Sequence, residues 1–191
     1  MTFSGGPAGD HPREPSATTD GHAGPGPRLG RGAVIYPSAR IIHPERLHLG
    51  DHSSIDDFVF LNAGAGSTIG RYVHIACHVS VIGNGGLEIG DYAVLATGAR
   101  ILTATDTFTG GARMSTHLPD EHRHVSVGRV IVGRDAFVGA NTVVLPGVNL
   151  GEGAVAGAGS VVTADLEPWT VYTGAPARPL RSRPRPALPG P

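Results

Sequence analysis

Aliphatic or alanine side chains recur at every sixth position through the second half of this chain of 191 residues. The run consists of Val132, Val138, Val144, Leu150, Ala156 and Val162. A helix repeats its buried positions every 3.6 residues and a simple strand every 2, so neither sustains a period of six. Short strands separated by regular turns do sustain it. The pattern predicts a parallel β-helix, in which three hexapeptides form one triangular coil and the coils stack about 4.8 Å apart.

The first half of the chain keeps this period but slips by two residues between groups. The groups in phase are Leu49, Ile55 and Leu61; Ile69 and Ile75; and Ile89, Leu95 and Ile101. A slip of this size fits a small insertion at a turn, such as the sequence GNGG at 83–86. We therefore expect roughly four coils from residues 31–102 and somewhat more than two from residues 132–173, by analogy with other repeat folds.

The repeat separates the chain into one domain, two tails and one insertion. Residues 1–30 are rich in Gly, Pro and Ser and almost lack aliphatic residues, which predicts a disordered tail. Residues 31–178 are predicted to form a single all-β domain, interrupted by one long inserted loop at about 103–131. Residues 179–191 are rich in Pro and Arg, and they are predicted to form a second tail.

Composition excludes several classes of protein. The formal net charge of −1 gives no overall field that would attract nucleic acid or an anionic membrane, so neither is expected as a partner. The single cysteine, Cys77, excludes an internal disulfide framework and a thiolate zinc site. The sequence has no signal-peptide pattern and no apolar run near the roughly 20 residues that span a bilayer, so a cytoplasmic location is expected.

Three motifs near the end of the repeat are typical of one superfamily. They are VVLPGV (143–148), GEGAVAGAGSVVT (151–163) and GAPAR (174–178). With them the chain resembles the left-handed β-helix hexapeptide acyltransferases, and within these the maltose, galactoside and polysaccharide-type O-acetyltransferases. The resemblance implies a homotrimer of parallel prisms, with acetyl-CoA lying between two subunits. It also implies direct transfer of the acetyl group to a hydroxyl of a sugar or glycosylated small molecule, with a histidine as general base and no metal.

The same resemblance suggests where CoA binds. Small residues that would wall the groove for the pantetheine arm are Gly139, Ala140, Gly157 and Ala158. The alternative is that these residues only satisfy the turns of the repeat. Arg178, in the position where relatives have lysine, would pair with CoA phosphates. Phe137 occupies the position of a tryptophan beside the thioester in maltose-type relatives, so it is expected to line the acceptor pocket.

The general base is not in its usual position. Maltose-type relatives have the catalytic histidine where this chain has Asp106, and an aspartate with its ordinary pKa near 3.9 is a weak base. His74 and His78 flank Ile75, which the repeat places inward, so both histidines are expected to point outward. We predict His74 as the base, with Asp106 orienting it or binding the acceptor, and His78 in the acceptor pocket. The alternative for His74 is simple packing against a neighbouring prism.

Further histidines lie in the insertion. His117 is a candidate for the acceptor pocket if the insertion covers the groove and lends a histidine across the subunit boundary. A mobile, solvated loop is the alternative. A zinc lyase like the γ-class carbonic anhydrases would need three imidazoles, which His74, His117 and His122 could supply. A β-helix scaffold without activity is the third reading.

Overall fold

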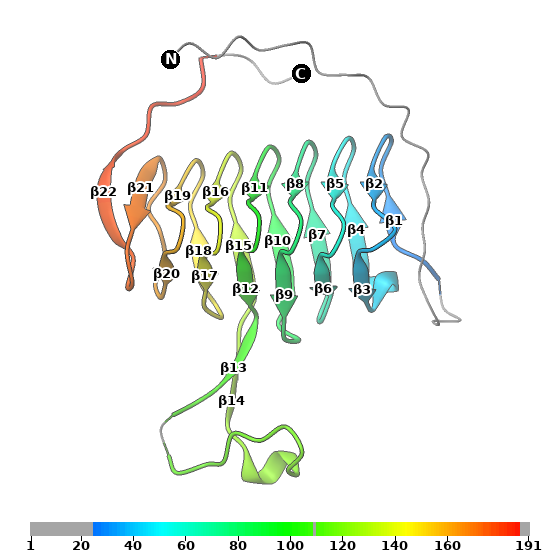
Figure 1. Ribbon diagram of the computed structural model, residues 1–191, viewed down its shortest axis with the longest axis vertical. Helices are drawn as coiled ribbons and strands as arrows, with labels where there is room; N and C mark the ends of the chain where they lie inside the picture. Colours follow the sequence, from blue (N-terminus) through cyan, green and yellow to red (C-terminus); the bar gives the residue numbers. More distant parts are fainter. Residues whose placement is uncertain (1–24, 109, 188–191) are drawn as a thin grey trace.

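The computed structural model describes residues 25–108 and 110–187, which form a parallel β-helix with a projecting arm (Figure 1). Three sheets make the sides of a triangular prism. Sheet A contains β1 (Arg28–Leu29), β4 (Leu47–Leu49), β7 (Ser67–Ile69), β10 (Leu87–Ile89), β15 (Val130–Val132) and β18 (Asn149–Leu150). Sheet B contains β2 (Val34–Ile35), β5 (Ser54–Ile55), β8 (His74–Ile75), β11 (Val94–Leu95), β16 (Phe137–Val138), β19 (Val155–Ala156), β21 (Thr170–Thr173) and β22 (Arg178–Ser182). Sheet C contains β3 (Arg40–Ile42), β6 (Phe60–Asn62), β9 (Ser80–Ile82), β12 (Arg100–Leu102), β17 (Val143–Val144) and β20 (Val161–Val162).

The period-six residues form the core, as the sequence predicts. In sheet B, Ile55 lies beside Ile75, which lies beside Leu95, which in turn lies beside Val138. All four side chains are fully buried. Each aliphatic residue therefore stacks on its counterpart in the next coil, and burial of this column of side chains gives the prism its main stabilisation.

The two-residue slips all lie at the corner between sheets C and A. Paired residues are 67 − 47 = 20 positions apart in the early coils and 149 − 131 = 18 apart in the late ones. The extra residues follow β6 and β9, before β7 and β10 begin. The long insertion leaves from the same corner, between the end of β12 and the start of β15. This corner is therefore where the prism accommodates added chain without disturbing its core.

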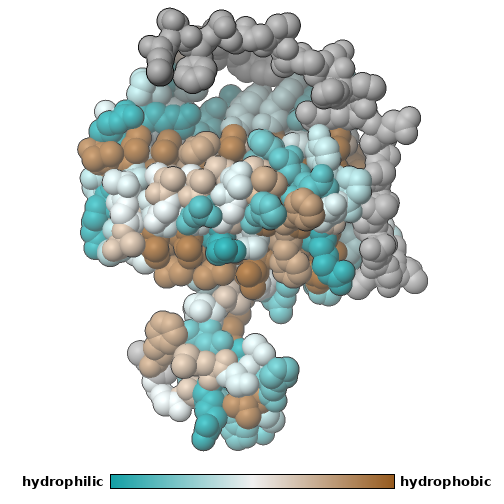
Figure 2. Space-filling model, viewed as in Figure 1, coloured by the Kyte–Doolittle hydropathy of each residue, from teal (hydrophilic) through white to brown (hydrophobic). Residues whose placement is uncertain are grey.

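The insertion has its own structure. It starts as an antiparallel hairpin of β13 (Ala104–Asp106) and β14 (Val125–Val127), and it includes the short 3-10 turn η2 (Asp120–His122). Figure 2 shows this arm as a separate lobe joined to the prism by a narrow neck. The sequence suggested a loop lying beside the groove. Within one chain the arm instead points away from the prism (Figure 1).

Strands extend beyond both domain boundaries expected from the sequence, at β1 (Arg28–Leu29) and β22 (Arg178–Ser182). Residues 1–24 and 188–191 of the expected tails lie outside the described residues, but β1 already pairs with β4, and β22 pairs antiparallel with β21. Arg183 then donates to the backbone carbonyls of Asp135 and Gly153, at 2.6 and 3.0 Å. The prolines of residues 179–191 led us to predict a tail there, but Pro179 lies within strand β22. An edge strand tolerates proline, because one side of its backbone needs no partner.

Charged side chains also link neighbouring coils. The Asp91 carboxylate accepts both the backbone N–H of Arg71 (2.7 Å) and its guanidinium (2.8 Å). These hydrogen bonds lower the pKa of Asp91 below its ordinary value.

No helix in the described part of the chain is long and apolar enough to cross a membrane.

Candidate functional site

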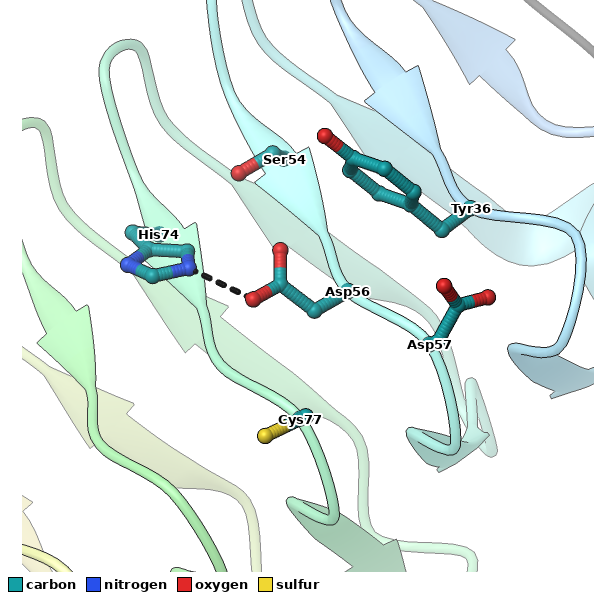
Figure 3. A pocket seen from close by; sticks show the side chains of 6 residues that line it. All are labelled: Tyr36, Ser54, Asp56, Asp57, His74 and Cys77. Atoms are coloured by element: carbon teal, nitrogen blue, oxygen red, sulfur yellow. Dashed lines mark hydrogen bonds and ion pairs between the residues drawn. The ribbon is translucent and has the colours of Figure 1, made fainter. Parts of the chain in front are cut away.

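A hollow of about 580 Å³ opens on the early strands of sheet B (Figure 3). Polar side chains line it: Tyr36, Ser54, Asp56, Asp57, His74 and Cys77. A β-helix face is usually poor in functional groups, since its outward side chains are spread along separate coils. Here a histidine, two carboxylates, a phenol, a hydroxyl and a thiol surround one open space.

The register of sheet B brings these residues together. Ser54 pairs with His74, so the outward side chains of β5 and β8 lie side by side. Asp56 comes two residues after Ser54, in the next outward position, because side chains alternate between the two faces of a strand. It therefore lies diagonally across from His74. The buried residues Ile55 and Ile75 fix this arrangement from the core side.

The central contact of the hollow is between His74 and Asp56. His74 Nε2 lies 2.9 Å from Asp56 Oδ2, and the two side chains are 49% and 29% exposed. A carboxylate can only accept a hydrogen bond, so Nε2 is the nitrogen that donates to Asp56, and in the neutral imidazole Nδ1 keeps its lone pair. A carboxylate that fixes the tautomer and orientation of an imidazole prepares it to take a proton from an acceptor.

Asp106 does not orient His74 within one chain, contrary to our expectation. It lies on β13 in the arm, and its Oδ1 accepts a hydrogen bond from Arg123 Nη2 at 2.9 Å. Both side chains are largely shielded, at 23% and 13% exposed. Asp106 belongs to the arm, whereas Asp56 lies next to His74 on sheet B. Sequence reasoning missed Asp56, although a 20-residue coil sets residue 54 beside residue 74 and so places residue 56 diagonally from it.

Phe137 shares a column of outward positions with His74. Val94 pairs with both residues, so Phe137 is two strand spacings, about 10 Å, from His74 along sheet B. Its side chain is 38% exposed. The structure thus places Phe137 on the same sheet as the hollow but not among the residues that line it, and its place in the acceptor pocket stays a prediction.

The four small residues predicted to wall the CoA groove follow β16 and β19 on the same edge of sheet B, and their local packing differs. A Cβ on Gly139 would lie 2.5 Å from the Ala158 backbone nitrogen, so packing between coils requires glycine at 139. Gly157 has more room, since its nearest neighbour would be 3.1 Å away. Ala140 is half-buried and Ala158 is exposed. Ala140, Gly157 and Ala158 therefore remain the accessible part of the predicted wall.

The other predicted site residues lie elsewhere. His78 has a left-handed backbone (φ 62°) and stacks on Phe58, with ring centroids 5.3 Å apart. His117 is exposed in the arm, and Arg178 is exposed at the start of β22. One chain does not bring these three residues into the His74 hollow.

A metal centre is not preformed in the residues the structure describes. No three His, Cys, Asp or Glu side chains there are grouped as metal ligands would be. His74 lies on the prism whereas His117 and His122 lie in the arm, so the three imidazoles considered for zinc are not gathered within a chain. The Cys77 thiol has one contact, with Thr97 Oγ1 at 3.7 Å.

Comparison with known proteins points to one family. The family model described as hexapeptide repeat of succinyl-transferase matches residues 129–164. The chain is 35% identical over 156 residues, 81% of both sequences, to dTDP-4-amino-4,6-dideoxy-D-glucose acyltransferase of Escherichia coli. It is 27% identical to galactoside O-acetyltransferase of Escherichia coli K12, covering 70% of this chain and 62% of that protein.

Solved structures give the same picture. A variant of AntD, an N-acyltransferase from Bacillus cereus, was solved with dTDP-4-amino-4,6-dideoxyglucose and coenzyme A. It matches with a TM-score of 0.78 and 33% identity, over 83% of this chain and 84% of that one. AntD was also solved with dTDP and 3-hydroxybutyryl-CoA, and that structure matches with the same TM-score and 34% identity.

Proposed function

Because the chain belongs to the hexapeptide-repeat acyltransferase family, whose members take an acyl group from acyl-CoA, we propose that this protein acylates the amino group of an amino-sugar nucleotide. The observation that carries the proposal is the His74–Asp56 pair in an open, acidic hollow. One relative is a dTDP-4-amino-4,6-dideoxy-D-glucose acyltransferase and another was solved with such an amino sugar nucleotide, and each matches over about four-fifths of the chain.

The proposed reaction is a direct transfer. The amine nitrogen of the acceptor attacks the thioester carbonyl, a C–N bond forms, and the C–S bond then breaks to release CoA. His74 Nδ1 takes the proton that the nitrogen loses, and Asp56 stabilises the imidazolium that results. The proton passes to the departing sulfur, so that the products are an amide and free CoA. His74 is the catalytic residue in this scheme, and Asp56 is a positioning residue.

An amine replaces the hydroxyl that the sequence led us to expect. An aliphatic amine is mostly protonated near neutral pH, and the carboxylates of Asp56 and Asp57 line the space it would enter. Asp57 uses Oδ1 to accept the backbone N–H of Ser38, which leaves Oδ2 for a ligand. The hollow thus attracts the ammonium form of the acceptor. The ammonium group loses one proton to solvent before it attacks, and His74 takes the second proton during the attack.

CoA and subunit contacts complete the proposal. Acyl-CoA, with acetyl as the first donor to test, would lie along the groove edge at Ala140, Gly157 and Ala158, and Arg178 would meet its phosphates.

We also propose a homotrimer. Phe108 and Val127 of the arm are 88% and 58% exposed, and apolar groups of that size favour a covering surface on a neighbouring copy.

An acceptor and donor panel tests this function. The purified full chain would be supplied with acetyl-CoA or 3-hydroxybutyryl-CoA, together with dTDP-4-amino-4,6-dideoxyglucose or the matching 4-hydroxy sugar nucleotide. We expect release of CoA thiol and an amide product by mass spectrometry, with kcat/KM for the amine at least ~100-fold above that for the hydroxyl. Turnover of only the hydroxyl acceptor would restore the O-acetyltransferase expectation. No thioester turnover with any pair would favour a non-catalytic scaffold.

Replacing Asp56 by asparagine tests its role as a positioning residue. Asparagine retains the size of the side chain but removes the charge that stabilises the His74 imidazolium. We expect kcat to fall by roughly 10-fold or more, with little change in KM for acyl-CoA or in thermal stability. Asp57→Asn is the matched control, since it removes the same charge from the same hollow without touching His74. An equal fall in kcat for both variants would refute a specific role for Asp56.

A further inference from the structure

We propose that sheet A carries a binding site for an organic diphosphate, on a different face of the prism from the His74 hollow. A second hollow, of about 370 Å³, opens over the early strands of this sheet. We call it the arginine trough. It is lined by Arg28, Glu45, Arg46, Leu47, His48, Gly66, Ser67, Thr68 and Arg129, and so it contains three arginines and one carboxylate. The inference deepens the proposed function and rests on it for the identity of the ligands, because acyl-CoA and a sugar nucleotide both contain a diphosphate.

Strand register explains the shape of the trough. Leu47, Ser67, Leu87 and Val130 are successive partners across sheet A. These four residues form one row across the sheet. The residues that precede them by one position form a parallel row, which consists of Arg46, Gly66, Gly86 and Arg129. Arginines stand at the two ends of this row and glycines lie between them. The end positions are three strand spacings apart, about 14 Å, which suits an elongated anion held between two long side chains.

The glycines leave the floor of the trough bare. A Cβ on Gly66 would meet nothing within 4 Å, so the space above this residue is open. A Cβ on Gly86 would lie 2.6 Å from the Gly66 carbonyl oxygen and 3.5 Å from Arg129 Nη2, so this position has no room for a side chain and the guanidinium group lies close to it. Both glycines have positive φ angles, of 116° and 84°, which larger residues adopt at a cost. Side chains at these two positions would close the trough.

The guanidinium groups retain capacity to bind an anion. The carboxylate contacts of Arg46 with Glu45 and of Arg129 with Glu88 are 3.5 and 3.7 Å long. Both are at or beyond the limit of a good hydrogen bond. Arg46 is held instead by donation from Nη1 to the Gly64 carbonyl at 2.9 Å, which fixes the side chain and leaves its other N–H groups available.

A third arginine adds to this charge. The Arg28 guanidinium group makes no hydrogen bond or ion pair with a described residue. The backbone of Arg28 pairs in register with His48, which pairs with Thr68. Together the row and this neighbouring column offer three guanidinium groups, an imidazole and a hydroxyl around one hollow. Guanidinium groups bind phosphate oxygens in a bidentate manner, and two or more of them suit a diphosphate better than a single carboxylate.

Binding of inorganic pyrophosphate, measured by calorimetry on the purified full chain, tests the site directly. We expect Arg46→Ala and Arg129→Ala each to weaken binding by about tenfold or more, because each removes charge-assisted hydrogen bonds. Arg40→Ala is the matched control, since Arg40 is an exposed arginine on β3 of sheet C. Binding should also weaken as salt concentration rises. Equal affinity in the wild type and the Arg46→Ala/Arg129→Ala double variant, or no binding to the wild type, would overturn the proposal.

The same variants identify the source of the diphosphate. Loss of affinity for dTDP with unchanged affinity for CoA assigns the trough to the sugar nucleotide, and the reverse assigns it to the acyl donor. Unchanged affinity for both would contradict the site even if pyrophosphate binds. His74→Ala separates this proposal from the proposed function, since that variant should bind pyrophosphate normally while acyl transfer is lost. A protein that binds pyrophosphate through the trough but transfers no acyl group would refute only the function.

Discussion

Replacement of His74 by alanine is expected to lower kcat for acyl transfer by about 10²- to 10⁴-fold, the range typical for loss of a general base. The amine must lose a proton as it attacks the thioester, and His74 is the one imidazole in the hollow. The KM for acyl-CoA should change little, because the predicted CoA contacts lie on later coils. Steady-state release of CoA thiol, measured at saturating acceptor, gives both constants.

The matched control for His74 is another exposed histidine on the prism. His52 stacks on Tyr72 with ring centroids 5.1 Å apart, and its backbone is left-handed (φ 58°). We therefore choose His52→Asn, since asparagine tolerates that conformation. This variant should retain near-normal turnover. If His74→Ala also retains it, the base lies elsewhere, and the arm histidines become the next candidates.

Replacement of Leu95 by alanine is expected to lower the free energy of unfolding by about 2–5 kcal/mol, as for other buried leucines. Leu95 is fully buried on β11, between Ile75 and Val138 in register. A cavity there interrupts the column of side chains in the middle of the prism, where rigid neighbours on both sides limit collapse. Denaturant unfolding followed by circular dichroism measures the change.

The neighbouring residue supplies the control for this experiment. Val94 is on the same strand but faces outward and is half-buried, so Val94→Ala should cost clearly less than Leu95→Ala. Equal losses would mean that the inward and outward assignments of β11 do not decide stability. The comparison therefore tests the period-six interpretation itself, independently of any activity.

Sequence alone predicted the parallel β-helix, most of its core and the corner insertions. These features are local. Aliphatic or alanine residues at every sixth position within each group, such as Val132 to Val162, fit the coils of a β-helix, and a slip of two residues fits an insertion at a turn. Outward placement of His74 followed from the same rule, because it precedes Ile75. Contiguous motifs such as GAPAR at 174–178 likewise indicated the acyltransferase family.

The tertiary structure decided which outward residues meet. Asp56 and His74 are 18 positions apart, and Arg46 and Arg129 are 83 apart, so their proximity depends on how many residues each coil contains. Each two-residue slip and the arm itself change the number of residues in a coil. The six-residue period alone therefore does not give the sequence separation of two residues that face each other in neighbouring coils. Asp106 shows the same effect in reverse, since it lies on β13 of the arm and pairs with Arg123 there, not with His74. Burial of aliphatic side chains repeats along the sequence, whereas contacts between exposed polar groups depend on the register between coils.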